Sequence, residues 1–426
     1  MKWNGLLGFL LAVPFVNGQQ KESSTTPASH EFQDLVAALP HCAIQCMAPL
    51  LQKSSCAIGD LDCMCANRDF EEKATVCVRA SCKLSEALVT KNLTEVACHR
   101  PIRDKSASYT AMNITTGVLA VIFALARLIF KQFFSCSQMV GPDDIIIVGA
   151  VMLGAPGIIV NQHGLIGNGL GKDVWTLPFA QLPDFAMYFY IMEIIYITEI
   201  SLIKLSLSVF YLYVFPGGRI RRLLIGTAIF NVCFGIAFVI TGVFQCTPVS
   251  FYWTQYLDNA PHGKCIDLNT FAWAHAAAGV AIDVWMIALP ISQIRRLDLH
   301  WKKKIGVTFM FLIGTFVTVI SLLRLKSVIY FANLINPTWD QWNVAWWSTM
   351  EVNIGIICTC LPTCRAILVR MFPNLLNTKE DGRSAICSQH LDTRIAEERG
   401  ICSMELPSAS TTVNDTKSAE KTYESL

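Results

Sequence analysis

Long apolar runs dominate the pattern of hydrophobic and polar positions between about residue 110 and residue 372. Each run is long enough to cross a hydrocarbon core of about 30 Å as an α-helix, because a helix rises about 1.5 Å per residue. We therefore predict an all-α bundle of transmembrane helices. The seven predicted spans lie at 113–133, 143–163, 185–214, 221–244, 268–292, 305–331 and 342–364.

The segments on either side of these runs have a different composition. MKW followed by GLLGFLLAVPF has the basic start and short apolar core of a secretory signal peptide, which we place at 1–18. A first membrane anchor is the alternative, although the run is short for a span. We expect a polar linker at 19–30, a cysteine-rich module at 31–100 and a disordered tail, rich in Ser, Thr, Glu and Lys, at 373–426.

Composition and loop charge support a membrane protein and predict its orientation. Charged residues make up 15% of the chain, whereas soluble domains carry about a quarter. The net charge of +2 gives no reason to expect a nucleic-acid partner. Short cytoplasmic loops carry an excess of Lys and Arg, and one set of alternate loops has only Lys172 and Lys264. We therefore predict a multi-pass protein of the cell membrane with its N-terminus extracellular. The basic, cytoplasmic set comprises Lys131, Arg219, Arg221, Arg222, Arg295, Arg296, Lys302, Lys303, Lys304, Arg365 and Arg370.

The cysteines are concentrated in the N-terminal module. Eight of the seventeen lie between Cys42 and Cys98, which indicates one disulfide-rich domain outside the cytosol. Cys42 and Cys46, four residues apart, share a helix face. Cys77 and Cys82 lie about a turn apart on a second helical stretch. Only nested pairs join two antiparallel helices at both levels, and two other cysteines are close enough to close their own loop. The predicted disulfides are Cys42–Cys82, Cys46–Cys77, Cys56–Cys63 and Cys65–Cys98.

These cysteines belong to a wider pattern that includes a proline and an aspartate. Pro40-x-Cys42-Ala43-x2-Cys46, then Asp60-x2-Cys63-x-Cys65 and the three later cysteines, resemble the CFEM domain of fungal extracellular membrane proteins. In haem-binding members of that family, the aspartate three residues before the CxC pair is the axial ligand of the haem iron. The resemblance therefore implies haem as a cofactor and Asp60 as its metal ligand. The alternative is that Asp60 only caps a helix or turn.

Dispersed motifs in the membrane part carry a second resemblance. They are Gly169-x-Gly171-Lys172-Asp173-Val174-Trp175, Asp283-x6-Leu289-Pro290-Ile291, Arg324-Leu325 and GIICTCLPTCRAIL. Over about 110–372 the chain resembles the fungal rhodopsin-like domain of receptor-like integral membrane proteins. With the CFEM module, this is the architecture of fungal G-protein-coupled-receptor-like proteins. No lysine lies in the last span, where a retinal protein needs one for its Schiff base, so retinal is not expected.

Ionisable residues inside the predicted spans are candidate functional groups, because each is costly unless it is paired or hydrated. Four of them fall roughly 10–14 Å from the outer ends, at 1.5 Å per residue, among several aromatic residues. This layer predicts a ligand pocket, formed by Glu193, His275, Arg324 and Glu351. The alternative is a set of structural pairs, Arg324–Glu351 and Lys204–Asp283. For the deeper group of Glu199, Lys204 and Asp283 we favour that structural interpretation.

Two further modifications are expected on the predicted outer side. Cys246 and Cys265 flank one outer loop and are expected to form a disulfide, and Asn92-Leu-Thr94 is a glycosylation sequon. The sequon in the first span, Asn113-Ile-Thr115, lies too near the membrane to be used.

Three functional hypotheses follow. The first is a receptor-like protein that senses extracellular or host-surface cues through the CFEM module and the seven helices and couples to a heterotrimeric G protein. The second is a haem- or iron-acquisition protein whose membrane part is an anchor or conduit. The third is a virulence-associated effector that alters host responses. We do not expect an enzyme, because no nucleophile–base pair or metal-ligand spacing stands out.

Overall fold

The computed structural model describes residues 28–371 apart from residues 58, 135–140, 216–217, 295–300 and 331–335. The predicted signal peptide, most of the predicted linker and the predicted tail lie outside the described residues. Five helices form the N-terminal module: α1 (Ala28–Ala38), α2 (His41–Lys53), α3 (Leu61–Ala66), α4 (Arg68–Ser81) and α5 (Leu84–Ala97).

The module is held together by disulfides around a small core. Cys42–Cys82 and Cys46–Cys77 join α2 to α4, as the nested-helix argument predicts, and the Cα atoms of these pairs are 5.5 and 5.8 Å apart. Cys56–Cys63 and Cys65–Cys98 complete the predicted set. The core between them contains little more than Ala43, Cys46 and Val78. A core this small needs such cross-links, because apolar burial alone stabilises short domains only marginally.

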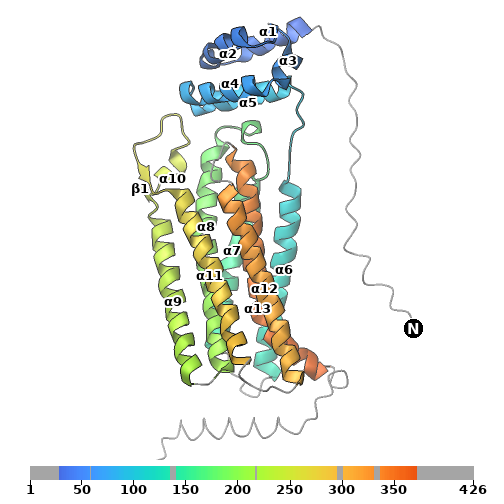
Figure 1. Cartoon of the computed structure of the whole chain (residues 1–426), viewed down its shortest axis with the longest axis vertical. Helices are drawn as coiled ribbons and strands as arrows, with labels where there is room; N and C mark the ends of the chain where they lie inside the picture. Colours follow the sequence, from blue (N-terminus) through green and yellow to red (C-terminus); the bar gives the residue numbers. More distant parts are fainter. Residues whose placement is uncertain are drawn as a thin grey trace, which may run out of the picture. The chain divides into compact units, whose positions relative to one another are not determined.

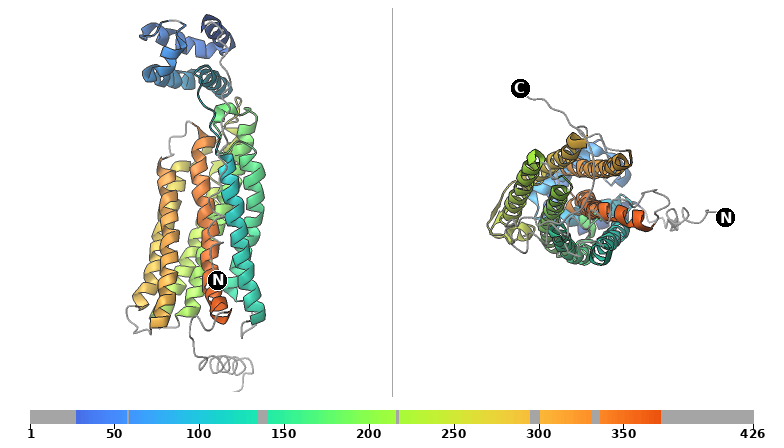
Figure 2. Two further views of the ribbon diagram at one scale, coloured as in Figure 1. Left: turned by 90° about the vertical axis from the view of Figure 1, so that its right-hand side faces the viewer. Right: turned by 90° about the horizontal axis from the view of Figure 1, so that it is seen from below.

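The rest of the described chain has seven long helices. They run alongside one another (Figures 1 and 2). Six of them are long and apolar enough to cross a bilayer by length and composition. The seventh, α12, has 30 residues, and the side chains of its first part lie outside the described set. The helices are α6 (Ser106–Phe134), α7 (Pro142–Ile159), α8 (Gln181–Val214), α9 (Gly218–Val243), α11 (Leu268–Ile294), α12 (Trp301–Tyr330) and α13 (Pro337–Met371).

The start of α7 shows how local sequence sets a helix boundary. Pro142 occupies the first turn, where its missing N–H costs nothing, and the carboxylate of Asp144 accepts a hydrogen bond from the backbone N–H of Gly141 at 2.9 Å. At its other end, α7 contains Pro156 and continues as a π-helical turn, η1 (Val160–Ile166). Proline removes a backbone donor, and π-turns of this kind often occur at functional sites.

The bundle buries polar groups inside and presents apolar side chains outside. α8 packs against both α7 and α9, and α11 packs against α12. On α6, Ile114, Val118, Ile122 and Leu125 are exposed at spacings of three or four residues, so they form one outward face. An apolar face of this kind suits contact with lipid.

A small hairpin closes one end of the bundle between α9 and α11. Strand β1 (Cys246–Thr247) pairs with β2 (Lys264–Cys265) in antiparallel register, and the Cys246–Cys265 disulfide joins the two strands. The short helix α10 (Phe251–Thr254) lies in the loop between them, and the 3₁₀ turn η2 (Val174–Thr176) lies in the loop between α7 and α8. We call this the disulfide end of the bundle.

Candidate functional sites

An apolar cavity of about 580 Å³ is lined mainly by the N-terminal module. Five residues from the disulfide end of the bundle complete its lining: Val174, Trp175, Leu182, Tyr256 and Pro337. This volume lies within the usual range for ligand pockets, about 300–1,000 Å³. Its apolar lining includes side chains that suit contact with a flat ring such as a porphyrin: Ile44, Met47, Leu51, Leu61 and Met64. Phe32 from α1 and Phe70 from α4 also line it. The cavity can therefore take a largely apolar ligand.

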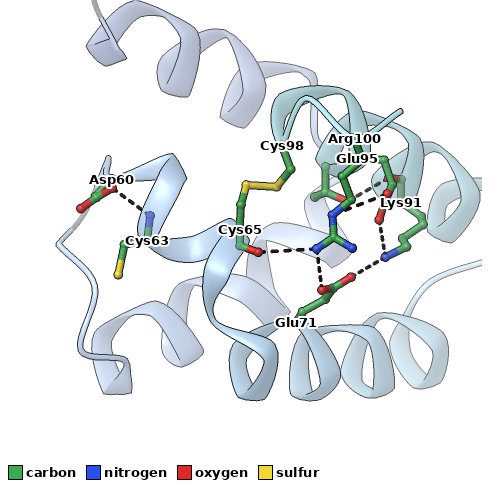
Figure 3. The surroundings of a disulfide bond; sticks show 9 residues. Asp60, Cys63, Cys65, Glu71, Lys91, Glu95, Cys98 and Arg100 are labelled. Atoms are coloured by element: carbon green, nitrogen blue, oxygen red, sulfur yellow. Dashed lines mark hydrogen bonds and ion pairs between the residues drawn. A yellow bond between two sulfur atoms is a disulfide. The ribbon is translucent and has the colours of Figure 1, made fainter. Parts of the chain in front are cut away.

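Asp60 lies on the loop that the Cys56–Cys63 disulfide closes, directly before α3. It is exposed, and its Oδ1 accepts a hydrogen bond from the backbone N–H of Cys63 at 3.0 Å (Figure 3). The carboxylate is therefore the N-cap of α3, as the alternative reading of the sequence held. Gly59, with a φ of +96°, makes the turn that precedes it. Asp62 is exposed in the first turn of the same helix.

The residues around Asp60 are of the chemical types that a haem site needs. One carboxylate oxygen serves as the cap, and a carboxylate has lone pairs left over for a metal. The residue after Asp60, Leu61, lines the apolar cavity, and so does Met64 one turn later. Asp60 itself does not line the cavity. It would supply the hard oxygen ligand, and the cavity residues would supply apolar cover.

A cluster of charged residues borders the Cys65–Cys98 disulfide (Figure 3). Glu71 accepts hydrogen bonds from Lys91 and Arg100, both at 2.8 Å, and Glu95 pairs with Lys91 at 2.7 Å. Arg100 also donates to the carbonyl of Cys65 at 3.5 Å. Burial acts to raise the pKa of Glu71, but the hydrogen bonds and charges of Lys91 and Arg100 outweigh it and lower that pKa. The cluster fastens α4 and α5 to the residues that follow them.

One group of potential metal ligands occurs among the described residues, at Cys42, Cys82 and Glu86. Both sulfur atoms belong to the Cys42–Cys82 disulfide, which is 2.00 Å long. A disulfide sulfur is not the thiolate that binds metals. Glu86 instead accepts the backbone N–H of Lys83 at 3.1 Å, as a cap of α5. We therefore assign this group a structural role.

At the disulfide end of the bundle, Asp173 ties three segments together. Its carboxylate is 3% exposed and forms a two-pronged ion pair with Arg103, one bond of which, from Nε, is 3.1 Å. It also accepts a hydrogen bond from Asn336 Nδ2 at 2.7 Å, and Asn336 Oδ1 accepts the backbone N–H of Val174 at 2.9 Å. The GxGKDVW motif therefore joins the start of α6, the α7–α8 loop and the start of α13.

The two glycines of this motif have conformations that other residues rarely adopt. Gly169 and Gly171 have φ values of +100° and +86°. A Cβ on Gly171 would lie 2.8 Å from Trp342 and 3.2 Å from the backbone of Lys105. The carbonyl of Gly171 also accepts the backbone N–H of Lys105, and its N–H donates to the carbonyl of Thr338. The tight turn and the close packing of this loop therefore require glycine at both positions.

A buried polar network crosses the middle of the bundle. Lys204 on α8 pairs with Asp283 on α11 at 2.7 Å, and Ser321 on α12 lies 2.8 Å from Asp283 and 2.6 Å from Glu351 on α13. Tyr196 on α8 donates to Glu351 at 2.8 Å. Four helices are thus linked by one continuous chain of polar contacts.

Arg324 occupies the edge of this network. Its guanidinium lies 4.1 Å from the ring centre of Tyr196 and 3.9 Å from the Glu351 carboxylate, and its Nε donates to Ser348 at 3.0 Å. Both structural pairs considered from the sequence, Arg324–Glu351 and Lys204–Asp283, are therefore present. Because a serine hydroxyl carries one hydrogen, Ser321 donates to only one of the two carboxyl groups at a time.

The four residues of the predicted ligand pocket do not share one cavity. A cavity of about 280 Å³ is lined by residues of α6, α7, α8, α11, α12 and α13, and of the four only Glu193 and Arg324 line it. Glu351 lies in the network beside it. His275 packs among Phe234, Phe238 and Tyr196, with ring centres 5.0–5.8 Å apart. Helical depth gives the level of a residue but not the direction in which its side chain points.

One buried ionic group was not singled out from the sequence. Arg127 on α6 is 1% exposed and pairs with Asp143 and with Asp144, the latter at 2.7 Å, at the start of α7. It also donates to the backbone carbonyl of Thr359 on α13. An arginine inside one apolar run and two adjacent aspartates at the start of the next were the signal available. The group joins α6, α7 and α13 at the end of the bundle opposite the disulfide end.

Comparison with known proteins places both parts of the chain. The profile of the fungal rhodopsin domain matches residues 109–370, which is more than half of the chain. The chain belongs to the fungal rhodopsin domain family. The profile of the CFEM domain matches residues 35–99, so the protein combines a CFEM domain with a fungal rhodopsin domain.

Curated relatives of this fungal rhodopsin protein include membrane proteins and a receptor. It is 31% identical over 220 residues to a SAT4 family membrane protein of Emericella nidulans, a match that covers 50% of this chain and 54% of the relative. It is 27% identical over 180 residues to satratoxin biosynthesis SC1 cluster protein 4 of Stachybotrys chartarum, covering 42% and 63%. It is 23% identical over 198 residues to the receptor GIN3 of Arthrobotrys oligospora, covering 46% and 47%.

The chain thus spans about half to under two thirds of the length of these relatives. No solved structure matches the chain.

Proposed function

We propose that this fungal rhodopsin protein is a receptor that senses an extracellular or host-surface cue and passes the signal through its helices to a heterotrimeric G protein. In this proposal the CFEM domain is extracellular and the tail is cytoplasmic, which the distribution of basic residues among the loops supports. The likeness to a protein named as a receptor supports the same class of function.

The observation that carries the proposal is that two residues belong both to the lining of the 280 Å³ cavity and to the polar network. Tyr196 and Arg324 line the cavity, and both also hold Glu351. A ligand that draws Arg324 or Tyr196 toward itself therefore weakens contacts that join α8, α12 and α13. Polar contacts with a small number of discrete arrangements are the kind of element that can couple two sites.

The test measures nucleotide exchange by a purified fungal heterotrimeric G protein, with the full-length receptor in nanodiscs. Glu351→Gln keeps the side-chain shape but removes the charge that faces Arg324. We expect it to change the exchange rate by about fivefold or more, since allosteric coupling is typically at least 1 kcal/mol. Thr241→Val is the control, because Thr241 is exposed on α9 and bonds only to the carbonyl of Ala237 in its own helix.

Exchange equal to that of empty nanodiscs, for the native protein and for Glu351→Gln alike, would contradict the proposal. The membrane part would then be an anchor or conduit.

The second candidate function is haem binding by the CFEM domain, which is favoured by the place of Asp60 directly before Leu61, a residue of the cavity lining. Asp60 would hold the iron and the cavity residues would cover the ring. When bound, the haem would supply a redox-active iron. A carboxylate is a hard oxygen donor, so we expect it to hold ferric iron better than ferrous iron.

The test is visible absorption of the full-length protein in nanodiscs titrated with ferric haem. Asp60→Ala should abolish the haem spectrum, and Asp62→Ala, which changes an exposed residue two positions away, should largely preserve it. Because Asp60 also caps α3, its loss should destabilise the loop by about 1 kcal/mol. Asp60→Asn retains a cap oxygen and should still lose haem. Equal binding by Asp60→Asn and the native protein would leave the aspartate as a cap alone.

A further inference from the structure

The cavity of about 280 Å³ in the bundle contains polar side chains that lack partners among the described residues. Glu199 is 5% exposed and Asn113 is 1% exposed, and both line the cavity. Glu199 Oε1 and both polar atoms of the Asn113 amide have no hydrogen-bond partner among the described residues. The structural interpretation of the group of Glu199, Lys204 and Asp283 names no partner for Glu199, and the structure shows none for its Oε1 within the described part of the chain. A buried, unpartnered polar group costs about 1–3 kcal/mol, more if it is charged.

Small residues bring this carboxylate close to the neighbouring helix. Gly154 on α7 lies against Glu199 so closely that a Cβ there would meet Glu199 Oε1. Gly117 of α6 lies close to Ile158 of α7, where a Cβ would be 2.8 Å from the isoleucine Cδ1. The apolar part of the lining includes Val121 and Val151, so the cavity is apolar around a few polar groups.

The charges on the lining favour a cation. Arg324 is the one basic residue on the described lining, and Glu351 lies on its other side at 3.9 Å. Glu193 lines the cavity and accepts a hydrogen bond from Gln245 at 3.1 Å, which leaves Glu199 as the carboxylate without a donor. The rings of Tyr109, Tyr196, Tyr252 and Tyr256 also line the cavity. Aromatic faces attract cations, as carboxylates do.

We propose that this cavity binds a lipophilic amine, whose ammonium group pairs with Glu199, whose polar substituent meets Asn113 and whose apolar body lies against Val121 and Val151. Its volume of about 280 Å³ suits a small ligand. The signalling consequence of such binding rests on the proposed receptor function, but the binding itself does not.

The experiment uses octylamine that carries a photoactivatable diazirine on its chain, with the full-length protein in nanodiscs and peptide mapping by mass spectrometry. Octanol and octanoic acid with the same diazirine are the matched probes. We expect saturable labelling of cavity-lining peptides from the bundle helices, with the amine labelling them about tenfold or more above the acid. Equal labelling by the acid would overturn the proposal, and so would unsaturable labelling by the amine.

Three variants make the test specific. Glu199→Gln should reduce amine labelling about tenfold or more, whereas Asp184→Asn, at an exposed carboxylate in the first turn of α8 outside the cavity lining, should change it by less than about twofold. Val121→Phe leaves Glu199 intact but fills the cavity, so it should also remove labelling. Persistence of labelling in both Glu199→Gln and Val121→Phe would show that the amine binds elsewhere.

The same preparations separate this proposal from the receptor function. Saturable labelling that leaves G-protein nucleotide exchange unchanged would support the binding site and count against the receptor function. Nucleotide exchange that responds to Glu351→Gln, without any specific amine labelling, would support the receptor function and contradict the amine site. The cavity would then hold only water or lipid.

Discussion

The buried pair of Lys204 and Asp283 gives a quantitative test of the polar network. Their nearest oxygen and nitrogen are 2.7 Å apart, and the two residues are 7% and 9% exposed. Among the described residues, Asp283→Ala leaves the ammonium with one acceptor, the backbone carbonyl of Gly279 at 2.7 Å. Removing one member of a buried pair costs about 3–5 kcal/mol, and a lysine at a bilayer centre costs about 2.5–3.5 kcal/mol on insertion scales. We therefore expect Asp283→Ala to lower the free energy of unfolding by about 3 kcal/mol.

The double variant separates the pair from its surroundings. Lys204→Met with Asp283→Leu replaces both charges by apolar groups of similar size, which is often neutral or stabilising. We expect the double variant to lie within about 1 kcal/mol of the native protein, although the single changes of this cycle, Lys204→Met and Asp283→Leu, each cost about 3 kcal/mol. Such non-additivity is the signature of a direct interaction. Ser321 keeps Glu351 as its partner in every variant.

The assay is reversible unfolding of the full-length protein in bicelles by titration with sodium dodecyl sulfate. Thr241→Val, at an exposed position on α9, is the control and should change the free energy of unfolding by less than about 0.5 kcal/mol. The reasoning is refuted if Asp283→Ala costs less than about 1 kcal/mol. It is also refuted if the cost of the double variant equals the sum of the two single costs.

Two further predictions concern the CFEM domain and the loop motif. Because the pKa of Glu71 is lowered, its ion pairs contribute stability that is fully present above the unfolded-state pKa of 4.5 and is lost as pH falls through the folded-state pKa. Glu71→Gln should therefore flatten the dependence of thermal stability on pH below about pH 4.5. An unchanged pH dependence would exclude the Glu71 ion pairs as the source of that stability. Gly171→Ala should destabilise the bundle by about 1–3 kcal/mol, because an alanine is strained at the positive φ of this position. Its control Gly149→Ala, at an open position on α7, should be neutral or stabilising by up to about 1 kcal/mol. Equal effects of the two variants in thermal unfolding would contradict backbone strain at position 171.

The sequence by itself determined the parts of the molecule that depend on local pattern. Apolar run length predicted the seven long helices, because crossing a bilayer requires a minimum number of apolar residues. Each predicted span lies within an observed helix or its continuation, apart from a residue at an end. Helical spacing also predicted the nested disulfides of Cys42 and Cys46, because two cysteines on one face can reach only a facing helix.

The tertiary structure decided which side chains meet. Depth along a helix placed Glu193, His275, Arg324 and Glu351 in one layer, but rotation about each helix axis sent His275 among aromatic rings and left Glu351 beside the cavity. Packing also decided that Lys204 reaches Asp283, whereas Glu199 faces a cavity with no partner in the described chain. A sequence fixes the spacing of residues along each helix, and only the packing of several helices fixes the distances between their side chains.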